Sequence, residues 1–389
     1  MIDVEDDTVI KQAPLVMIPG PTPVADSIRQ AMAVQTYGHT YGGFVEIYKE
    51  CLAGLKQIFQ ADHMIVTGGA GTLSMEMGLI NTVRAGEEIL VISHGVFGDR
   101  FTAIAKALGI KADVLTCPIG ETVPLADIEA KLAAKSYQAL TLTHVDTSTG
   151  AMGQVSEVGQ LAQKYNTLFI LDGVCASAGA AEHMKDQNID MIVTSCQKAF
   201  GTPPGLVMVA FNDRVLARRE ELGTVPSYYS DFKNWLPIME NPSLYFATPP
   251  VNLILALNES VKIILEEGLT PRYHRHDRIA RSFRAGLAAL GLKCATAEAA
   301  MAPTLSLILY PEGVDDAAFR AKLEQYDVFV AGGLGSLKGK AFRVGHMGNI
   351  CINELVITLY AIERALAAVG TEVKPGAGVG AAWTEWHKG

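Results

Sequence analysis

A lysine and an aspartate follow two short apolar runs of this chain, and together they could carry out carbonyl chemistry. Lys198 comes shortly after the run Met191–Ser195, and Asp172 closes the run Thr167–Leu171. A buried lysine can lose its proton and form an imine with a carbonyl compound. A buried carboxylate can hold the nitrogen of a pyridine ring protonated, which pyridoxal phosphate (PLP) needs in order to act as an electron sink. This pair therefore indicates a PLP-dependent reaction.

Two other features could bind anionic groups. The segment Gly68–Thr72 follows a strand-like run and opens a helix-like one, so a phosphate could approach its backbone and bind the N–H groups at the helix start. A tight turn between a strand and a helix would also explain this segment. Arg343 lies inside the apolar run Ala341–Gly345 and needs a partner, since an unpaired buried charge is unfavourable. That partner is either a structural carboxylate or the carboxylate of a substrate.

Histidines offer weaker candidates. His39 and His346 could line the same pocket, or they could be structural side chains with satisfied hydrogen bonds. The group His274, His276 and Asp277 has the residue types of a metal site, but its place on a charged helix start favours a solvated face. We therefore predict no metal site.

The elements that must position these residues alternate between helix and strand. Strand-like runs are Met64–Thr67, Glu88–Ile92, Lys111–Leu115, Ala139–Thr143, Leu168–Asp172 and Met191–Ser195. Helical spacing occurs over Phe44–Phe59, Thr72–Val83, Arg100–Leu108, Val155–Tyr165 and Val251–Glu267. Such alternation predicts an α/β fold with a mainly parallel sheet covered by helices. Ligands bind at the carboxyl ends of the strands in such sheets, where Asp172 and Lys198 are expected.

The C-terminal third has a different rhythm, which predicts a second, smaller α/β domain. Its expected helices are Arg278–Leu290 and Ala317–Gln325, with strands at Thr304–Tyr310, at Val328–Val330 and around Arg343. We predict an N-terminal arm over 1–20, a large domain over 21–260 and a small domain over 261–373. The Gly- and Ala-rich segment 374–389 is expected to be a flexible tail.

Composition narrows the class of protein. A chain of 389 residues with 49% apolar residues can bury two cores, and a net charge of −9 argues against a general nucleic-acid or membrane-surface binder. Six scattered cysteines without a C-x-x-C pair predict free thiols, as in the cytosol. The acidic N-terminus lacks the features of a signal peptide, and no apolar run approaches about 20 residues. We expect a cytoplasmic enzyme.

From about Pro19 to Ala368 the chain resembles the class V aminotransferases of PLP fold type I. Within that class it is close to the alanine–glyoxylate and serine–glyoxylate aminotransferases. The resemblance rests on the motifs Pro19-Gly20-Pro21, Gly69 to Glu76, Thr143-His144, Ser148-Thr149-Gly150, Leu171-Asp172, Gln197-Lys198-Ala199, Pro203-Pro204-Gly205 and Gly332-Gly333-Leu334-Gly335 with Arg343.

The resemblance implies how the cofactor is held. Lys198 would form the Schiff base with PLP, and Asp172 would pair with the pyridinium nitrogen. The further cofactor-binding set would be Ala70, Gly71, Thr72, Phe97, Ser148, Gln197, Tyr245 and Thr248. The amides of the first three, with the Gln197 side chain, would hold the phosphate, and Phe97 would stack on the ring. Tyr245 and Thr248 would reach the phosphate of a neighbouring subunit, which implies a homodimer with shared active sites.

The resemblance also implies the reaction. Arg343, Ser148 and Gly20 would bind the substrate. The expected activity is transfer of an amino group from alanine or serine to a 2-oxo acid such as glyoxylate or pyruvate. Relatives acting on ureidoglycine, pyridoxamine or an aminophosphonate remain alternatives, because Thr72 stands where a mammalian relative has histidine. A cysteine desulfurase usually has histidine directly before the lysine, whereas this chain has Gln197.

Overall fold

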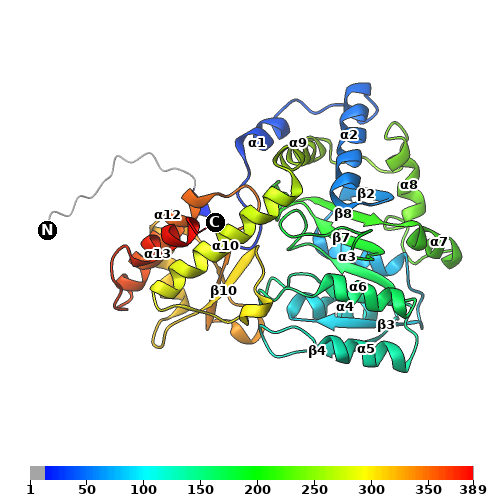
Figure 1. Ribbon diagram of the computed structural model, residues 1–389. Helices are drawn as coiled ribbons and strands as arrows, with labels where there is room; N and C mark the ends of the chain where they lie inside the picture. The colour runs from blue at the N-terminus through cyan, green and yellow to red at the C-terminus, as the bar shows by residue number, and fades with distance from the viewer. Residues whose placement is uncertain (1–13, 389) are drawn as a thin grey trace.

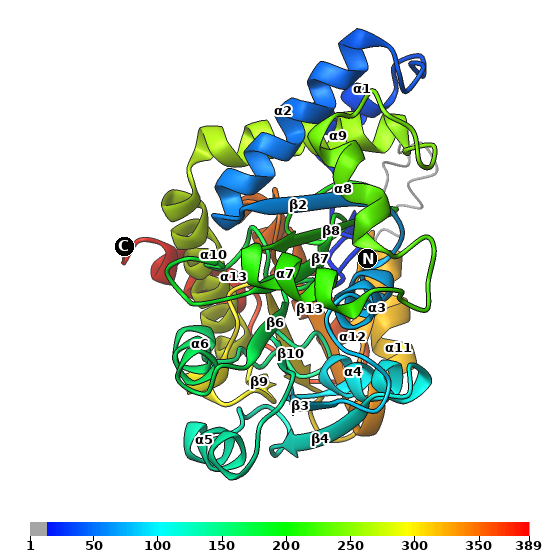
Figure 2. The same ribbon diagram turned by 90° about the vertical axis from the view of Figure 1, so that its right-hand side faces the viewer.

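A seven-stranded sheet forms the centre of the computed structural model, which describes residues 14–388 (Figure 1). Its strands, in chain order, are β2 (His63–Gly68), β3 (Glu88–Ser93), β4 (Lys111–Thr116), β5 (Ala139–Thr143), β6 (Leu168–Asp172), β7 (Met191–Ser195) and β8 (Leu206–Phe211). The spatial order is β2-β8-β7-β6-β5-β3-β4. Figure 2 labels β2, β8, β7, β6, β3 and β4 from the top of the view downward. Strand β8 runs antiparallel to the other six strands of this sheet. The predicted α/β fold with a mainly parallel sheet is confirmed, although the sequence pattern did not predict β8.

Helices cover both faces of this sheet, because successive strand residues point to opposite sides. In β6, Phe169 and Leu171 join the core on one face, while Leu168 and Ile170 join the core on the other. The first face packs against α2 (Gly42–Phe59), α5 (Leu125–Ala134), α6 (Val155–Lys164) and α9 (Val251–Glu267). The second packs against α3 (Gly71–Ile80), α4 (Val96–Ala107), α7 (Asp213–Leu222) and α8 (Phe232–Glu240).

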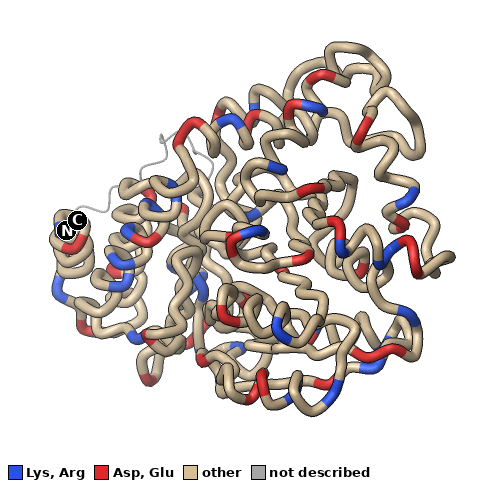
Figure 3. Tube along the Cα trace, turned by 45° about the vertical axis from the view of Figure 1, so that its right-hand side comes forward, with Lys and Arg blue, Asp and Glu red and all other residues tan. Residues whose placement is uncertain are grey.

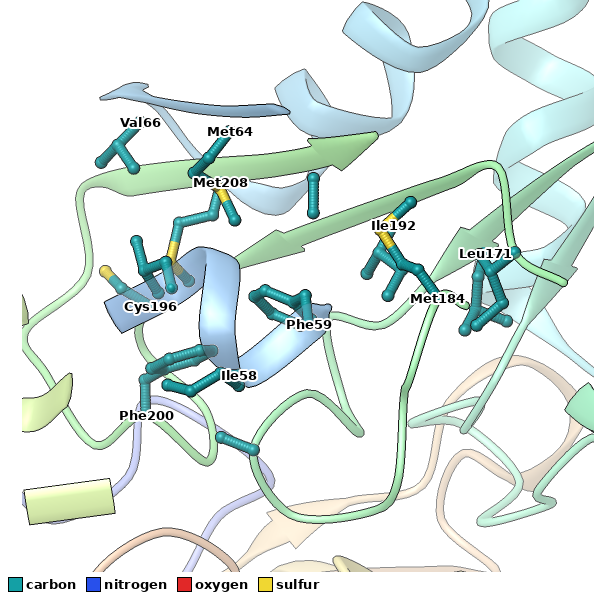
Figure 4. Close-up of a cluster of buried hydrophobic side chains, with 14 of the residues drawn as sticks. Ile58, Phe59, Met64, Val66, Leu171, Met184, Ile192, Cys196, Phe200 and Met208 are labelled. Atoms are coloured by element: carbon teal, nitrogen blue, oxygen red, sulfur yellow. The ribbon is translucent and has the colours of Figure 1, made fainter. Parts of the chain in front are cut away.

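The first of these cores extends to the strand ends that carry the chemistry. Figure 4 shows Leu171 and Cys196 among packed side chains that include Phe59 and Phe200. Leu171 directly precedes Asp172, and Cys196 and Phe200 flank Lys198 by two positions on each side. Because protein interiors are close-packed, this packing fixes the backbone on which both polar side chains stand.

A second, antiparallel sheet has its own core (Figure 1). Its order is β12 (Ala331–Gly332), β13 (Ala341–Gly345), β10 (Leu305–Leu309) and β9 (Lys293–Cys294). It packs with α10 (Leu269–Ala289), α11 (Asp316–Gln325), α12 (Ile352–Ala368) and α13 (Ala377–Trp386). The segment β1 (Leu15–Val16) pairs with β11 (Val328–Phe329), and α1 (Asp26–Met32) follows it. Two short 3₁₀ turns are Glu298–Ala300 and Gly335–Leu337.

Three expectations differ from the structure or lie outside it. Helix α10 begins at Leu269 rather than at Arg278, because Pro271 lies in its first turn, where proline is tolerated. The expected tail contains α13, which packs against α10. Most of the predicted arm 1–20, with the acidic N-terminus, lies outside the described residues.

Charge is distributed without a dominant sign over the trace, as Figure 3 shows. Across residues 14–388, no helix has both the length and the apolar composition needed to cross a bilayer. All six cysteines are free thiols, as predicted.

Candidate active site at the strand ends

Lys198 lies in the turn after β7 and is 8% exposed. Its ammonium nitrogen Nζ donates to the carbonyl oxygen of Pro19 and lies 3.4 Å from Oγ1 of Thr147. A Cβ atom placed on Gly20 would lie 2.6 Å from Cδ of Lys198, so only glycine fits beside this side chain. Burial lowers the pKa of Lys198, and the charge of Arg343 acts in the same direction. The lysine is therefore held in a place that favours its neutral amine.

Hydrogen bonds from distant segments hold the backbone around Lys198. Oγ1 of Thr22 donates to the carbonyl oxygen of Lys198 at 2.7 Å. The guanidinium of Arg272 donates to the next carbonyl, that of Ala199, at 2.7 Å. Sequence reasoning missed both donors, because they lie 176 and 73 positions away from their acceptors.

Asp172 ends β6, the strand beside β7, and is 2% exposed. Its carboxylate accepts hydrogen bonds from Oγ1 of Thr143 (3.2 Å) and from the backbone N–H of Val174 (3.0 Å). Burial raises the pKa of Asp172 to about 7, with the nearby carboxylates Asp146 and Glu182 adding to the shift. Within residues 14–388 no lysine or arginine pairs with it, so a cationic ring nitrogen would supply the missing partner.

The start of α3 offers a place for a phosphate. Helix-start amides have no partner within their own helix, and Gly71 and Thr72 occupy these positions. Oγ of Ser195 is fully buried beside them and has no hydrogen-bond partner among the described residues. A Cβ atom on Gly71 would lie 3.2 Å from that hydroxyl and 2.8 Å from Cγ2 of Val174. An unpartnered donor facing a helix N-terminus fits an anionic ligand.

Ala70 and Gln197 are two further residues expected to bind the phosphate. Ala70 is the N-cap residue of α3 and is exposed. Gln197 is half-buried, and its side-chain amide has no hydrogen bond within the described part of the chain. Both groups are therefore free to bind a ligand.

The start of α4 is held by two residues of the turn after β5. The carboxylate of Asp146 accepts from the amides of Phe97 (2.9 Å) and Gly98 (3.1 Å). Oγ of Ser148 accepts from the amide of Val96 at 3.0 Å and donates to Asp146 at 2.5 Å. The Ser148 hydroxyl thus keeps one free lone pair, and Phe97 is held half-buried in the first turn of α4. Sequence reasoning missed Asp146, although its Asp-x-Ser spacing is typical of a local side-chain cap.

Arg343, in β13, brings the second sheet to Lys198. Its Nε donates to the carbonyl oxygen of Gly332 (2.9 Å) and its Nη1 to that of Thr147 (3.1 Å). Thr147 therefore contacts both Arg343 and Lys198. Burial lowers the pKa of the Arg343 guanidinium, which is 8% exposed, and no carboxylate forms an ion pair with it in residues 14–388. A carboxylate ligand fits its remaining donors.

Tyr245 and Thr248 lie elsewhere on the surface. Their hydroxyls are 3.5 Å apart, and Tyr245 is 64% exposed, with its ring centroid 5.3 Å from that of His39. Neither side chain contacts Lys198 or Asp172 within the described chain. They do not complete the site of their own subunit.

Two of the candidate histidines, His346 and His276, are structural. His346 is fully buried between Oγ of Ser306 (2.9 Å) and the carbonyl oxygen of Pro303 (3.0 Å). His276 is also fully buried and accepts from the amide of Gly348 at 3.0 Å, so the expectation of a solvated face at His276 is wrong. It is buried because α10 starts nine residues before Arg278.

The residues present fit PLP on three counts: an unpaired buried carboxylate, an unpartnered hydroxyl at a helix N-terminus and a buried lysine with a lowered pKa. Comparison with known proteins agrees. The family model for aminotransferase class V matches residues 26–346. An uncharacterized aminotransferase of Methanocaldococcus jannaschii is 35% identical over 366 residues, which cover 92% of this chain and 94% of that protein.

Two further relatives have named substrates. Alanine–glyoxylate aminotransferase 1 of Saccharomyces cerevisiae is 33% identical over 368 residues, covering 88% of this chain and 94% of that protein. The crystal structure of an alanine–glyoxylate aminotransferase from Nostoc sp. has a TM-score of 0.88 and 29% identity, with 92% of this chain and 97% of that chain covered. The resemblance inferred from the sequence is confirmed, and this chain belongs to the PLP-dependent class V aminotransferases.

Proposed function

We propose that the protein transfers the amino group of a small amino acid, alanine or serine, to a 2-oxo acid such as glyoxylate or pyruvate. The observation that carries this proposal is the placement of Lys198 and Asp172 at the ends of neighbouring parallel strands. When bound, PLP supplies an aldehyde that binds amines and a ring that accepts electrons. The protein supplies position, charge and proton transfer.

Lys198 is proposed as nucleophile and base. Its lowered pKa makes a neutral Nζ available, and the contacts with Pro19 and Thr147 aim that nitrogen. With the substrate's amine bound, the same Nζ would be free to take the proton from the substrate's Cα and deliver it to the carbon of the cofactor's former aldehyde group. Asp172 is proposed to hold the ring nitrogen protonated, since its buried carboxylate gains a cationic partner there.

The phosphate is proposed to lie at the start of α3. Its ligands would be the amides of Ala70, Gly71 and Thr72, the side chain of Gln197 and Oγ of Ser195. Phe97 is proposed to stack on the ring, and the free lone pair of Ser148 to accept from cofactor or substrate.

Arg343 is proposed to bind the substrate's carboxylate, with the Gly20 backbone closing the other side of Lys198. Arg343 is the one cation that acts on Lys198 in the described chain. One buried guanidinium with free donors matches one carboxylate group of the substrate. This supports a monocarboxylate amino acid with a small side chain.

We also propose a homodimer in which Tyr245 and Thr248 reach the phosphate of the partner's site. Their exposed hydroxyls lie next to each other and bind nothing else in the described chain. A neighbouring subunit would bury them.

A half-reaction screen tests the proposed substrates. The purified yellow enzyme would be mixed with alanine, serine, aspartate, ureidoglycine, pyridoxamine and 2-aminoethylphosphonate, one at a time. We expect alanine or serine to remove the cofactor's visible absorbance fastest and to yield the matching oxo acid by mass spectrometry. Faster loss of this absorbance with aspartate, or with a compound that lacks a carboxylate, would contradict the proposal.

A lysine variant tests the chemistry. Lys198→Ala is expected to lower turnover by about 1,000-fold or more, because nucleophile and base are lost together. Reduction of the wild-type enzyme with borohydride should attach the cofactor to the peptide that contains Lys198. Lys262→Ala, an exposed position on α9, is the control and should keep full activity. Retained activity in Lys198→Ala would refute the assignment.

A further inference from the structure

Arg100, in the first turns of α4, joins two residues expected to contact the cofactor. Its Nη1 donates to Oγ1 of Thr72 at 2.9 Å. Its Cζ lies 4.6 Å from the centroid of the Phe97 ring. The guanidinium therefore links the start of α3 to the start of α4, and it lies at the edge of the proposed phosphate site.

The charge of Arg100 is not compensated by a carboxylate in residues 14–388. Asp99, its neighbour, accepts instead from Oγ of Ser93 at 2.7 Å. Asp146 is occupied by helix-start amides, and Glu76, one turn along α3, forms no ion pair with Arg100. The Thr72 bond uses one of five N–H donors. A half-buried guanidinium with free donors and no counter-ion favours an anionic ligand.

The anion that fits is a phosphate on the α3 N-terminus. Three separate features face this place: the free amides of Gly71 and Thr72, the unpartnered hydroxyl of Ser195, and Arg100 bound to Thr72 itself. A guanidinium that sits on a helix-start residue adds a full positive charge to the partial charge of the helix.

We propose that Arg100 is a further binding residue for the phosphate of PLP. The inference rests on the proposed placement of the phosphate at the start of α3. In this arrangement Arg100, on α4, contributes the positive charge of the phosphate site. The amides at the start of α3 contribute hydrogen bonds of fixed direction. Arg100 takes no part in proton transfer.

The test compares two cofactor forms that differ only in the phosphate. Apo-protein would be titrated with PLP and with pyridoxal, and the dissociation constants read from absorbance and protein fluorescence. Arg100→Gln is expected to raise the dissociation constant of PLP by about 10- to 100-fold, the range for a lost charged hydrogen bond. Pyridoxal binding should change less than about threefold. Inorganic phosphate should compete with PLP for wild-type apo-protein and compete much less for the variant.

Two further variants complete the test. Arg100→Lys keeps the charge without the planar fork and should give an intermediate PLP affinity. Lys106→Gln removes a positive charge from the exposed side of the same helix and should leave PLP affinity unchanged. Equal weakening of PLP and pyridoxal by Arg100→Gln would overturn the phosphate assignment, and so would an unchanged PLP affinity. Either result leaves the Lys198 experiments unaffected, so the two proposals fail separately.

Discussion

At the scale of single residues, the site holds a buried carboxylate that has no cationic partner until a ligand supplies one. Asp172 is held at the end of β6 with two hydrogen bonds and no cation, and burial raises its pKa to about 7. The unfolded chain would ionise the same carboxylate near pH 4. Between these values the folded protein binds more protons than the unfolded chain, so the free energy of unfolding falls as pH rises from about 4 to 7. We expect this pH dependence of the free energy of unfolding for the cofactor-free protein.

Replacement by an uncharged isostere should therefore act in opposite directions with and without cofactor. Cofactor-free Asp172→Asn is expected to be more stable than wild type above about pH 7, by at most about 4 kcal/mol, and this advantage should shrink toward pH 4. Its PLP affinity should be lower, because the ring nitrogen loses its anionic partner. Urea unfolding from pH 5 to pH 9 measures the first effect, with the exposed Asp127→Asn on α5 as control. A variant that is less stable than wild type at every pH would contradict this account.

Residue types and their apolar surroundings are enough to predict part of the site. Lys198, Asp172 and Arg343 are charged residues in apolar runs. In the structure Lys198 and Arg343 both contact Thr147, and the charge of Asp172 acts on Lys198. Asp146 could not be assigned in this way, because its carboxylate caps α4 across 49 positions of sequence. Contacts of this kind depend on the fold, and a single sequence does not contain them.

At the scale of elements, boundaries set by the local sequence pattern were predicted well, and boundaries set by distant contacts were not. Strands β5, β6 and β7 match their predicted limits, because both faces are buried and the apolar run is the strand itself. Helix α4 begins four residues before the predicted start, since its first amides bond to Asp146 and Ser148 rather than to a local cap. Helix α13 was missed because Gly378 and Gly380 lower the helix propensity of this segment, and its stability depends on packing against α10.

A substitution at the α10–α13 contact tests that dependence. A Cβ atom on Gly286 would lie 2.6 Å from Cδ1 of Leu359 and 2.8 Å from the carbonyl oxygen of Gly378. Gly286→Val is expected to lower the free energy of unfolding by about 1–3 kcal/mol and to speed proteolysis of the C-terminal segment. Gly380→Ala, on α13 with no atom near its Cβ, should be neutral or stabilising by up to about 1 kcal/mol. Equal effects of the two substitutions would mean that α13 packs differently.

At the scale of the whole molecule, each subunit is proposed to contribute residues to the active site of its partner. Tyr245 is 64% exposed and Tyr228 78%, and both belong to segments beside α8 and α9. Tyr37 and Tyr41, exposed by 37% and 59%, lie in the segment between α1 and α2 that includes His39. Exposed aromatic side chains gathered in this way are typical of a protein–protein interface. A two-fold dimer would place the same surface of each subunit against the other.

Mixing two inactive variants tests whether the sites are shared. Lys198→Ala lacks the nucleophile, and the double variant Tyr245→Ala/Thr248→Ala lacks the proposed contacts to the partner's phosphate. In a hybrid dimer, one site combines Lys198 from the double variant with intact Tyr245 and Thr248 from the other subunit. Random reassociation makes half of the dimers hybrid, each with one intact site, so the mixture should recover about a quarter of wild-type activity. If differently tagged hybrids form but activity stays at the sum of the parents, each subunit uses its own Tyr245 and Thr248.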